Sequence, residues 1–174
     1  MKFENTLING AYVVNLNKRV DERGFFARFF CENEFKDKNL VNKFVQINNS
    51  VTKKKGTIRG MHYQIKPKEE VKIIRCISGK IFDVIVDLRE KSKTFMHWYG
   101  VELSSTNRKM LYVPKGCAHG FLTLSNNCEV LYLVSQAYSP KHERGFKFDD
   151  PKIKINWPTT ILFGSDKDFN WKNL

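Results

Sequence analysis

Four histidines and six tyrosines are the side chains in this sequence best suited to move protons near neutral pH. His62 falls in an expected strand, and an imidazole with an ordinary pKa of about 6.5 can accept a proton. Tyr132 falls in the apolar run Val130–Val134, and a phenol with an ordinary pKa of about 10 stays protonated and can donate. Taken singly, either residue is more often part of a core. Together they could remove a proton from one face of a carbon and return one to the other.

Metal chemistry is disfavoured by the spacing of the candidate ligands. The sequence His62-Tyr63-Gln64 lacks the closely spaced histidine pair of a metal-dependent cupin oxygenase, and His97 and His142 fall in expected loops. No C-x-x-C pair occurs among the four cysteines, which are Cys31, Cys76, Cys117 and Cys128. We therefore expect no metal, and because proton transfer needs only a base and an acid, we expect no cofactor.

Length and composition predict one globular domain over residues 1–174, since a chain of 174 residues can bury a sizeable single core. The hydrophobic fraction of 41% and charged fraction of 28% exclude a disordered chain. Aromatic residues make up 13%, which favours a β-rich core.

The formal net charge of +12 predicts an anionic partner. Nucleic acid is disfavoured because the lysines are scattered and no nucleic-acid-binding motif occurs, so a phosphorylated small molecule fits better. Part of the charge could also reflect the coding bias of an AT-rich genome. No signal peptide or apolar span is apparent, and we expect a cytoplasmic protein with reduced thiols and no membrane partner.

The elements that must position these residues are mostly short strands separated by turn signals. This pattern predicts an all-β sandwich or small barrel, closed as a jelly roll. Short helices are expected near Asn33–Asn39 and Asp166, and a turn at Asp21–Gly24. The expected strands are Tyr12–Leu16, Phe25–Phe30, Phe44–Asn48, Thr57–Gln64, Val71–Ile77, Ile81–Leu88, Trp98–Leu103, Lys109–Val113, His119–Leu124 and Val130–Ala137.

Six segments, in order and at matching spacing, together resemble the dTDP-4-dehydrorhamnose 3,5-epimerase family. They are DERGFF (Asp21–Phe26), FVQINNS (Phe44–Ser50), IRGMHYQ (Ile58–Gln64), KIIRCISGKIFDVIVDLR (Lys72–Arg89), VPKGCAHGFLTLS (Val113–Ser125) and YSPKHERGFKFDDPKIKINWP (Tyr138–Pro158). The resemblance implies a homodimeric, cupin-like jelly roll. It also implies a cofactor-independent epimerase that inverts C3, C5 or both in a nucleoside-diphosphate 4-keto-6-deoxy-sugar. Capsule or lipopolysaccharide biosynthesis is the implied setting.

The same resemblance implies the catalytic residues. His62 matches the family's base and Tyr132 its acid, while Lys72 matches the lysine beside the sugar ketone. Asp168 matches the carboxylate that orients the base, and Asp166 is a competitor because a one-residue gap precedes this segment.

Substrate-binding positions are implied in the same way. Arginines suit the diphosphate because guanidinium donors pair with phosphate oxygens. Arg28 stands where the family has a glutamate that helps to hold thymine, which opens the choice between dTDP and GDP, and between a hexose and a heptose. The implied substrate-binding residues are Arg23, Arg28, Gln46, Asn48, Arg59, His119, Tyr138 and Glu143.

Two other functions fit the same fold. One is a 3,4-ketoisomerase acting on a similar nucleotide sugar. The other is a non-catalytic sugar-binding jelly roll, although a binding protein would need neither His62 nor Tyr132.

Overall fold

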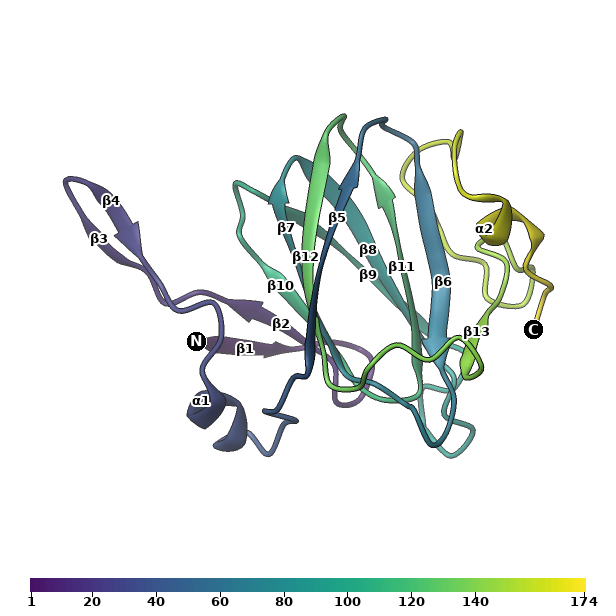
Figure 1. Ribbon diagram of the computed structural model, residues 1–174, viewed down its shortest axis with the longest axis horizontal. Helices are drawn as coiled ribbons and strands as arrows, with labels where there is room; N and C mark the ends of the chain where they lie inside the picture. The colour runs from purple at the N-terminus through teal and green to yellow at the C-terminus, as the bar shows by residue number, and fades with distance from the viewer.

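The computed structural model describes residues 1–174 and consists mainly of two antiparallel β-sheets that face each other (Figure 1). In spatial order the larger sheet contains β1 (Lys2–Asn5), β2 (Tyr12–Asn15), β10 (Met110–Val113), β7 (Lys72–Ser78), β12 (Cys128–Val134) and β5 (Gln46–Thr52). The smaller sheet contains β13 (Glu143–Gly145), β6 (Ile58–Gln64), β11 (Cys117–Thr123), β8 (Lys80–Asp87) and β9 (Trp98–Ser104). The expected all-β, jelly-roll class of fold is confirmed.

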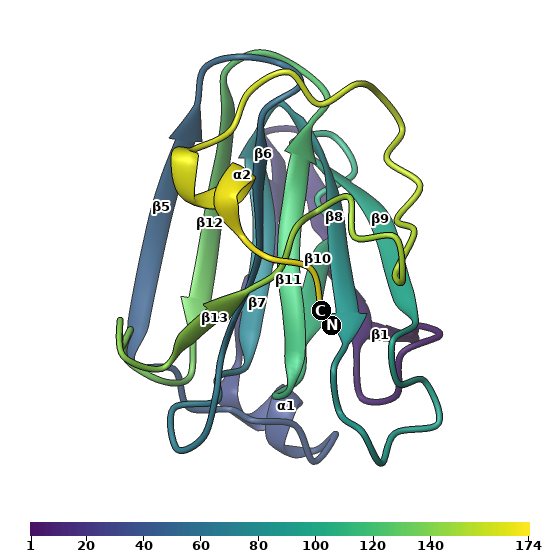
Figure 2. The same cartoon turned by 90° about the vertical axis from the view of Figure 1, so that its right-hand side faces the viewer.

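A separate hairpin and two short helices complete the chain. The hairpin pairs β3 (Arg19–Asp21) with β4 (Gly24–Phe26) and projects away from the sheets (Figure 1). The helices are α1 (Glu32–Lys36) and α2 (Asp166–Asn170). Figure 2 shows α2 beside β6, near the C-terminal end of the chain. Neither helix has the length and apolar character needed to cross a bilayer.

The core follows from the alternation of side chains along each strand. One cluster fills the space between the sheets and includes Ile74, Ile85 and Val130. A second cluster covers the outer face of the larger sheet, where α1 buries Phe35 completely. Burying one such side chain stabilises the fold by about 1.5–3 kcal/mol. On β5 the inward, half-buried positions are polar rather than apolar. The interior therefore becomes polar toward β5.

Most expected elements are present, with differences at their ends. The turn at Asp21–Gly24 is confirmed, but the strand that follows ends at Phe26 rather than Phe30. The strand expected at Phe44–Asn48 is shifted, since β5 runs over Gln46–Thr52. Three short strands, β1, β3 and β13, were not expected. β1 and β3 form hairpins with β2 and β4, whereas β13 pairs with the distant β6, a long-range contact that local sequence does not signal.

Gly60 allows β6 and β11 to approach closely just before His62. Its φ is +126°, and a Cβ at this position would lie 2.5 Å from Cα of Gly120 and 2.9 Å from the carbonyl oxygen of His119. Both atoms belong to backbone, which cannot move aside without disturbing the strand pairing. Only glycine fits here, and the close approach sets where His62 stands relative to β11.

Replacing Gly60 by alanine should lower the free energy of unfolding by about 3 kcal/mol or more, because backbone must separate and the positive φ is also strained. Gly24 is a matched control, since its φ is +128° but nothing lies within 4 Å of an added Cβ. Gly24→Ala should cost only about 1–2 kcal/mol of strain. Urea unfolding of the two variants tests this, and equal losses would contradict the steric argument.

Candidate active site

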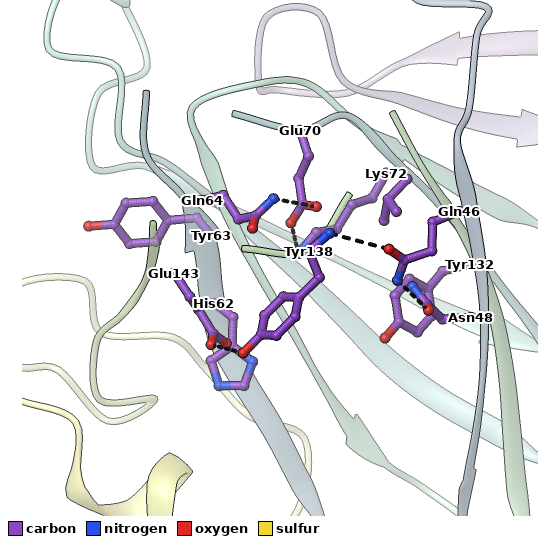
Figure 3. A pocket seen from close by; sticks show the side chains of 11 residues that line it. Gln46, Asn48, His62, Tyr63, Gln64, Glu70, Lys72, Tyr132, Tyr138 and Glu143 are labelled. Carbon is purple, nitrogen blue, oxygen red and sulfur yellow. Dashed lines mark hydrogen bonds and ion pairs between the residues drawn. The ribbon is translucent and has the colours of Figure 1, made fainter. Parts of the chain in front are cut away.

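Two adjoining hollows of about 390 and 480 Å³ open between β5, β7 and β12 on one side and β6 on the other. His62, Lys72 and Tyr132 line both hollows, so together they form one continuous cleft. His62 comes from the smaller sheet, whereas Lys72 and Tyr132 come from the larger one. Figure 3 shows the three side chains around the same space. The cleft has the size expected for a small-molecule site.

The His62 side chain is supported from behind by a carboxylate. Its Nε2 lies 2.7 Å from Oδ1 of Asp168, although the ring N–H is not aimed straight at that oxygen, so the contact is chiefly electrostatic. Nε2 is buried, which leaves Nδ1 as the ring nitrogen open to the cleft. Asp166, the competing carboxylate, is exposed on the same helix. The structure thus brings Asp168 to His62.

Asp168 is fixed by the beginning of α2. Ser165 is the N-cap residue of a capping box with Asp168, and its hydroxyl also donates to Oδ2 of Asp168 at 2.7 Å. The backbone amide of Gly60 donates to Oδ1 at 3.2 Å. Burial raises the pKa of Asp168, but the contacts with His62, Ser165 and Gly60 outweigh burial and leave the pKa below its ordinary value. The carboxylate therefore stays charged beside the imidazole.

Tyr132 points into the cleft from the opposite sheet. It lies directly across from Asn48 on β5 and Ile74 on β7. Burial raises the pKa of its phenol, and the nearby Glu70 carboxylate raises it further, while Arg59 lowers it. The phenol consequently remains protonated at neutral pH and can act as a proton donor.

Lys72 brings a positive charge to the same cleft. Its Nζ lies 3.1 Å from Oε1 of Glu70, and the two side chains are only 12% and 11% exposed. An ammonium has three donors, so a contact to one carboxylate leaves others for a ligand. A base, an acid and a cation around one cavity can support removal of a proton beside a carbonyl group, with the cation stabilising the resulting oxyanion.

Polar side chains predicted as substrate contacts line the hollow next to His62. On β5, the Gln46 amide donates to Asn48 at 2.7 Å, and its oxygen accepts from the amide of Tyr138 at 3.2 Å. The Tyr138 hydroxyl donates to Glu143 at 2.6 Å. Glu143 also receives a 2.6 Å contact from Lys167 of α2. All four predicted residues reach the cleft (Figure 3).

Arg59 and His119 line the other hollow, as predicted. Nε of Arg59 donates to the hydroxyl of Thr52 at 2.9 Å, while the residue stays exposed. Nε2 of His119 lies 2.7 Å from Oδ1 of Asp83, which is fully buried on β8. This half of the cleft therefore carries donors suited to an anionic group.

Arg23 and Arg28 do not reach the cleft within one chain. Arg23 lies at the tip of the projecting hairpin, where it pairs with Asp21 at 2.7 Å and its side chain is 85% exposed. Arg28 lies at the base of the hairpin, 3.6 Å from Glu34, and lines a separate hollow. The expectation that both contact the substrate is thus not met by a single copy, because the hairpin extends away from the sheets (Figure 1).

Three residues at the site were missed in the sequence. Glu70 could have been recognised, since it is an acidic residue two positions before Lys72, which was itself predicted to lie at the site. Gln64 and Asp83 had no usable signal, because their roles depend on contacts with Glu70 and His119. No group of three His, Cys, Asp or Glu side chains converges as metal ligands would.

Comparison with known proteins gives a consistent result. The sequence profile described as dTDP-4-dehydrorhamnose 3,5-epimerase matches residues 5–174. A protein of that name from Methanothermobacter thermautotrophicus is 43% identical over 99% of this chain and 94% of its own length.

Solved structures agree with the sequence match. A dTDP-4-dehydrorhamnose 3,5-epimerase from Bacillus anthracis, crystallised with TDP and pyrophosphate, superposes with a TM-score of 0.96 at 40% identity, covering 99% of both chains. An epimerase from Legionella pneumophila in complex with dTDP-4-keto-L-rhamnose gives a TM-score of 0.90 at 36% identity, covering 96% of this chain and 89% of that one. The similarity thus extends over nearly the whole chain.

Asp168 should contribute stability that depends on pH. Because its pKa is lowered in the folded state, the contribution is present above the unfolded pKa of about 3.9 and is lost as pH falls through the lower folded value. Asp168→Asn should reduce the free energy of unfolding at neutral pH by about 1–3 kcal/mol. The substitution should also make the loss of unfolding free energy at acidic pH less steep. Urea unfolding from neutral pH to about pH 3 measures both effects.

Asp166→Asn is the matched control on the same helix and should change neither quantity, since Asp166 is exposed. If the free energy of unfolding of Asp168→Asn falls with pH as steeply as that of the unmodified protein, the Asp168 carboxylate does not make the stabilising contacts described above.

Proposed function

The chain belongs to the dTDP-4-dehydrorhamnose 3,5-epimerase family, and from this premise we propose that residues 1–174 act as one epimerase domain with His62 as base and Tyr132 as acid. The protein is an isomerase that acts on a nucleotide-linked 4-keto-6-deoxy sugar without a cofactor. The observation that supports the two roles is the position of these side chains, on opposing sheets around one cleft.

The proposed reaction uses the acidity of carbons beside the C4 ketone. Nδ1 of His62 takes the proton from C5 or C3, and the electron pair moves to O4 as an enolate. Asp168 stabilises the imidazolium formed, at the 2.7 Å contact. The ammonium of Lys72 stabilises the charge on O4. Tyr132 then gives its proton to the opposite face of the carbon, and both groups return to their starting states by exchange with water.

We propose a dTDP-linked substrate, with its diphosphate toward Arg59 and His119. Both side chains line the hollow that adjoins the catalytic groups. The support for thymidine is that similar structures hold TDP or dTDP-4-keto-L-rhamnose. The Arg28 guanidinium can only donate hydrogen bonds, so it cannot accept one from the nucleobase as a glutamate would. The experiment below therefore also includes the alternative of a GDP-linked hexose or heptose.

We also propose a homodimer in which the hairpin of one copy reaches the cleft of the other. The hairpin exposes Val20, Phe25 and Phe26 at 75%, 41% and 66%. The edge strand β5, beside the cleft, exposes Ile47 and Val51 at 64% and 57%. Apolar groups on a projecting hairpin and an uncovered sheet edge are typical of an interface between copies. If the two copies exchange hairpins in this way, Arg23 of one copy would reach the diphosphate bound in the cleft of the other.

The reaction would take place in the cytoplasm, which suits four free thiols.

Incubation with dTDP- and GDP-linked 4-keto-6-deoxy sugars in heavy water, followed by NMR, tests the reaction. Deuterium should enter at C3, C5 or both of the dTDP sugar, and His62→Ala should reduce the exchange by about a thousandfold or more. His97→Ala is the control, since that imidazole is exposed on a loop. Exchange with the GDP sugar alone would overturn the nucleotide assignment. Isomerisation to a 3-ketone would indicate a ketoisomerase, and binding without exchange would indicate a sugar-binding protein.

The hairpin exchange can be tested by mixing two inactive variants. If each site combines the His62 of one copy with the Arg23 of the other, His62→Ala and Arg23→Ala chains unfolded and refolded together should regain about a quarter of full activity, because about half of the dimers are mixed and each has one intact site. Size-exclusion chromatography with light scattering measures the dimer. A dimer that shows no recovery on mixing would contradict the exchange.

A further inference from the structure

Glu70 carries a mostly buried carboxylate in the wall of the cleft, which Lys72 and Tyr132 also line. It lies just before β7, two positions from Lys72, and the two side chains line the same hollow. Its side chain is 11% exposed and contacts Nζ of Lys72 at 3.1 Å. Figure 3 shows Glu70 reaching toward both Gln64 and Lys72 from the wall of the cavity.

We propose that Glu70 is a positioning residue of the epimerase reaction, which fixes the ammonium of Lys72 beside Tyr132 and keeps the charge balanced there. The inference rests on the proposed function. Lysine is a flexible side chain, and a cation that must stabilise an oxyanion has to be held where the charge develops. The only carboxylate in contact with Nζ of Lys72 is that of Glu70.

Glu70 is itself held in place by Gln64, which is 4% exposed on β6. The Gln64 amide donates to Oε2 of Glu70 at 3.1 Å and to the carbonyl oxygen of Lys68 at 3.0 Å. Its oxygen accepts from the amide of Ser139 at 2.6 Å. Gln64 thus ties the carboxylate to the smaller sheet and to the segment that carries Tyr138. A carboxylate anchored from both sheets is suited to hold a cation at a fixed point.

Glu70 also acts on the phenol of Tyr132. Burial is the largest cause of the raised pKa of Tyr132, and the charge of Glu70 adds to it. The other charged or titratable groups around this part of the cleft are Arg59, His62 and Tyr63 from β6, Lys72 and Cys76 from β7, His119 from β11, Glu143 from β13, Asp168 from α2, and Tyr138. Of the charges that act on the phenol, Arg59 lowers its pKa and Glu70 raises it, so Glu70 opposes Arg59.

The test is Glu70→Gln, which keeps the shape of the side chain but removes its charge. We expect kcat on the 4-keto sugar to fall by about tenfold, because Lys72 loses its fixed position. The alkaline limb of the pH profile of kcat should move to lower pH, since Tyr132 loses the charge that opposes its ionisation. A purely structural role for Glu70 would lower the amount of active protein without moving this limb.

Two further variants make the outcome decisive. Glu69→Gln removes a neighbouring carboxylate that does not line the catalytic cleft, and it should leave kcat and the limb unchanged. Glu70→Asp keeps the charge, so it should lower kcat but retain the alkaline limb. If Glu70→Gln does not fold, the test is made with Glu70→Asp instead. An unchanged kcat in Glu70→Asp would show that the position of Lys72 does not depend on Glu70.

A titration without substrate separates this inference from the proposed function. The ultraviolet difference between the unmodified protein and Tyr132→Phe reports the ionisation of that phenol alone. In the Glu70→Gln background the transition should occur at lower pH. An unmoved transition together with an unchanged kcat would overturn the role of Glu70. Absence of turnover by the unmodified protein, with the expected shift in the phenol, would instead count against the proposed function only.

Discussion

The site depends on one constraint, the two-residue alternation of side chains in two sheets that face each other. The inward positions of β12 include Val130, which belongs to the core, and Tyr132, which lines the cleft. A shift of one residue in the pairing of β12 with β7 would turn Tyr132 to the outer face and Leu131 inward. The packing that stabilises the fold therefore also fixes Tyr132, the proposed acid, across the cleft from His62.

Charge within the cleft is balanced in local pairs. Asp168 faces His62, Glu70 faces Lys72 and Glu143 faces Lys167, each at 2.6–3.1 Å. Each of these three carboxylates thus has a basic partner, so none is left unpaired in the wall of the cleft. Arg59 has no carboxylate partner and donates only to neutral oxygens. The arrangement leaves a free positive charge where an anionic part of a ligand would lie, and a nearly neutral environment where protons would move.

Sequence reasoning predicted which strand residues meet in the cleft better than it predicted the contacts made by distant segments. The placement of His62, Lys72 and Tyr132 in one cleft followed from motifs in strands whose alternation is readable. Glu143 belongs to β13, a three-residue strand that exists only through its pairing with β6, so its support could not be predicted. Arg23 matched a binding motif, yet its position depends on the direction of a projecting hairpin. Such features are set by tertiary contacts rather than by local pattern.

The central claim is that two different groups act on opposite faces of one carbon. It is tested most directly with Tyr132→Phe, by measuring deuterium exchange and inversion separately in the same NMR experiment. Because the base remains, the account predicts exchange at the carbon beside the ketone with retention of configuration, and a loss of inverted product. Inversion at the unmodified rate in Tyr132→Phe would contradict the account.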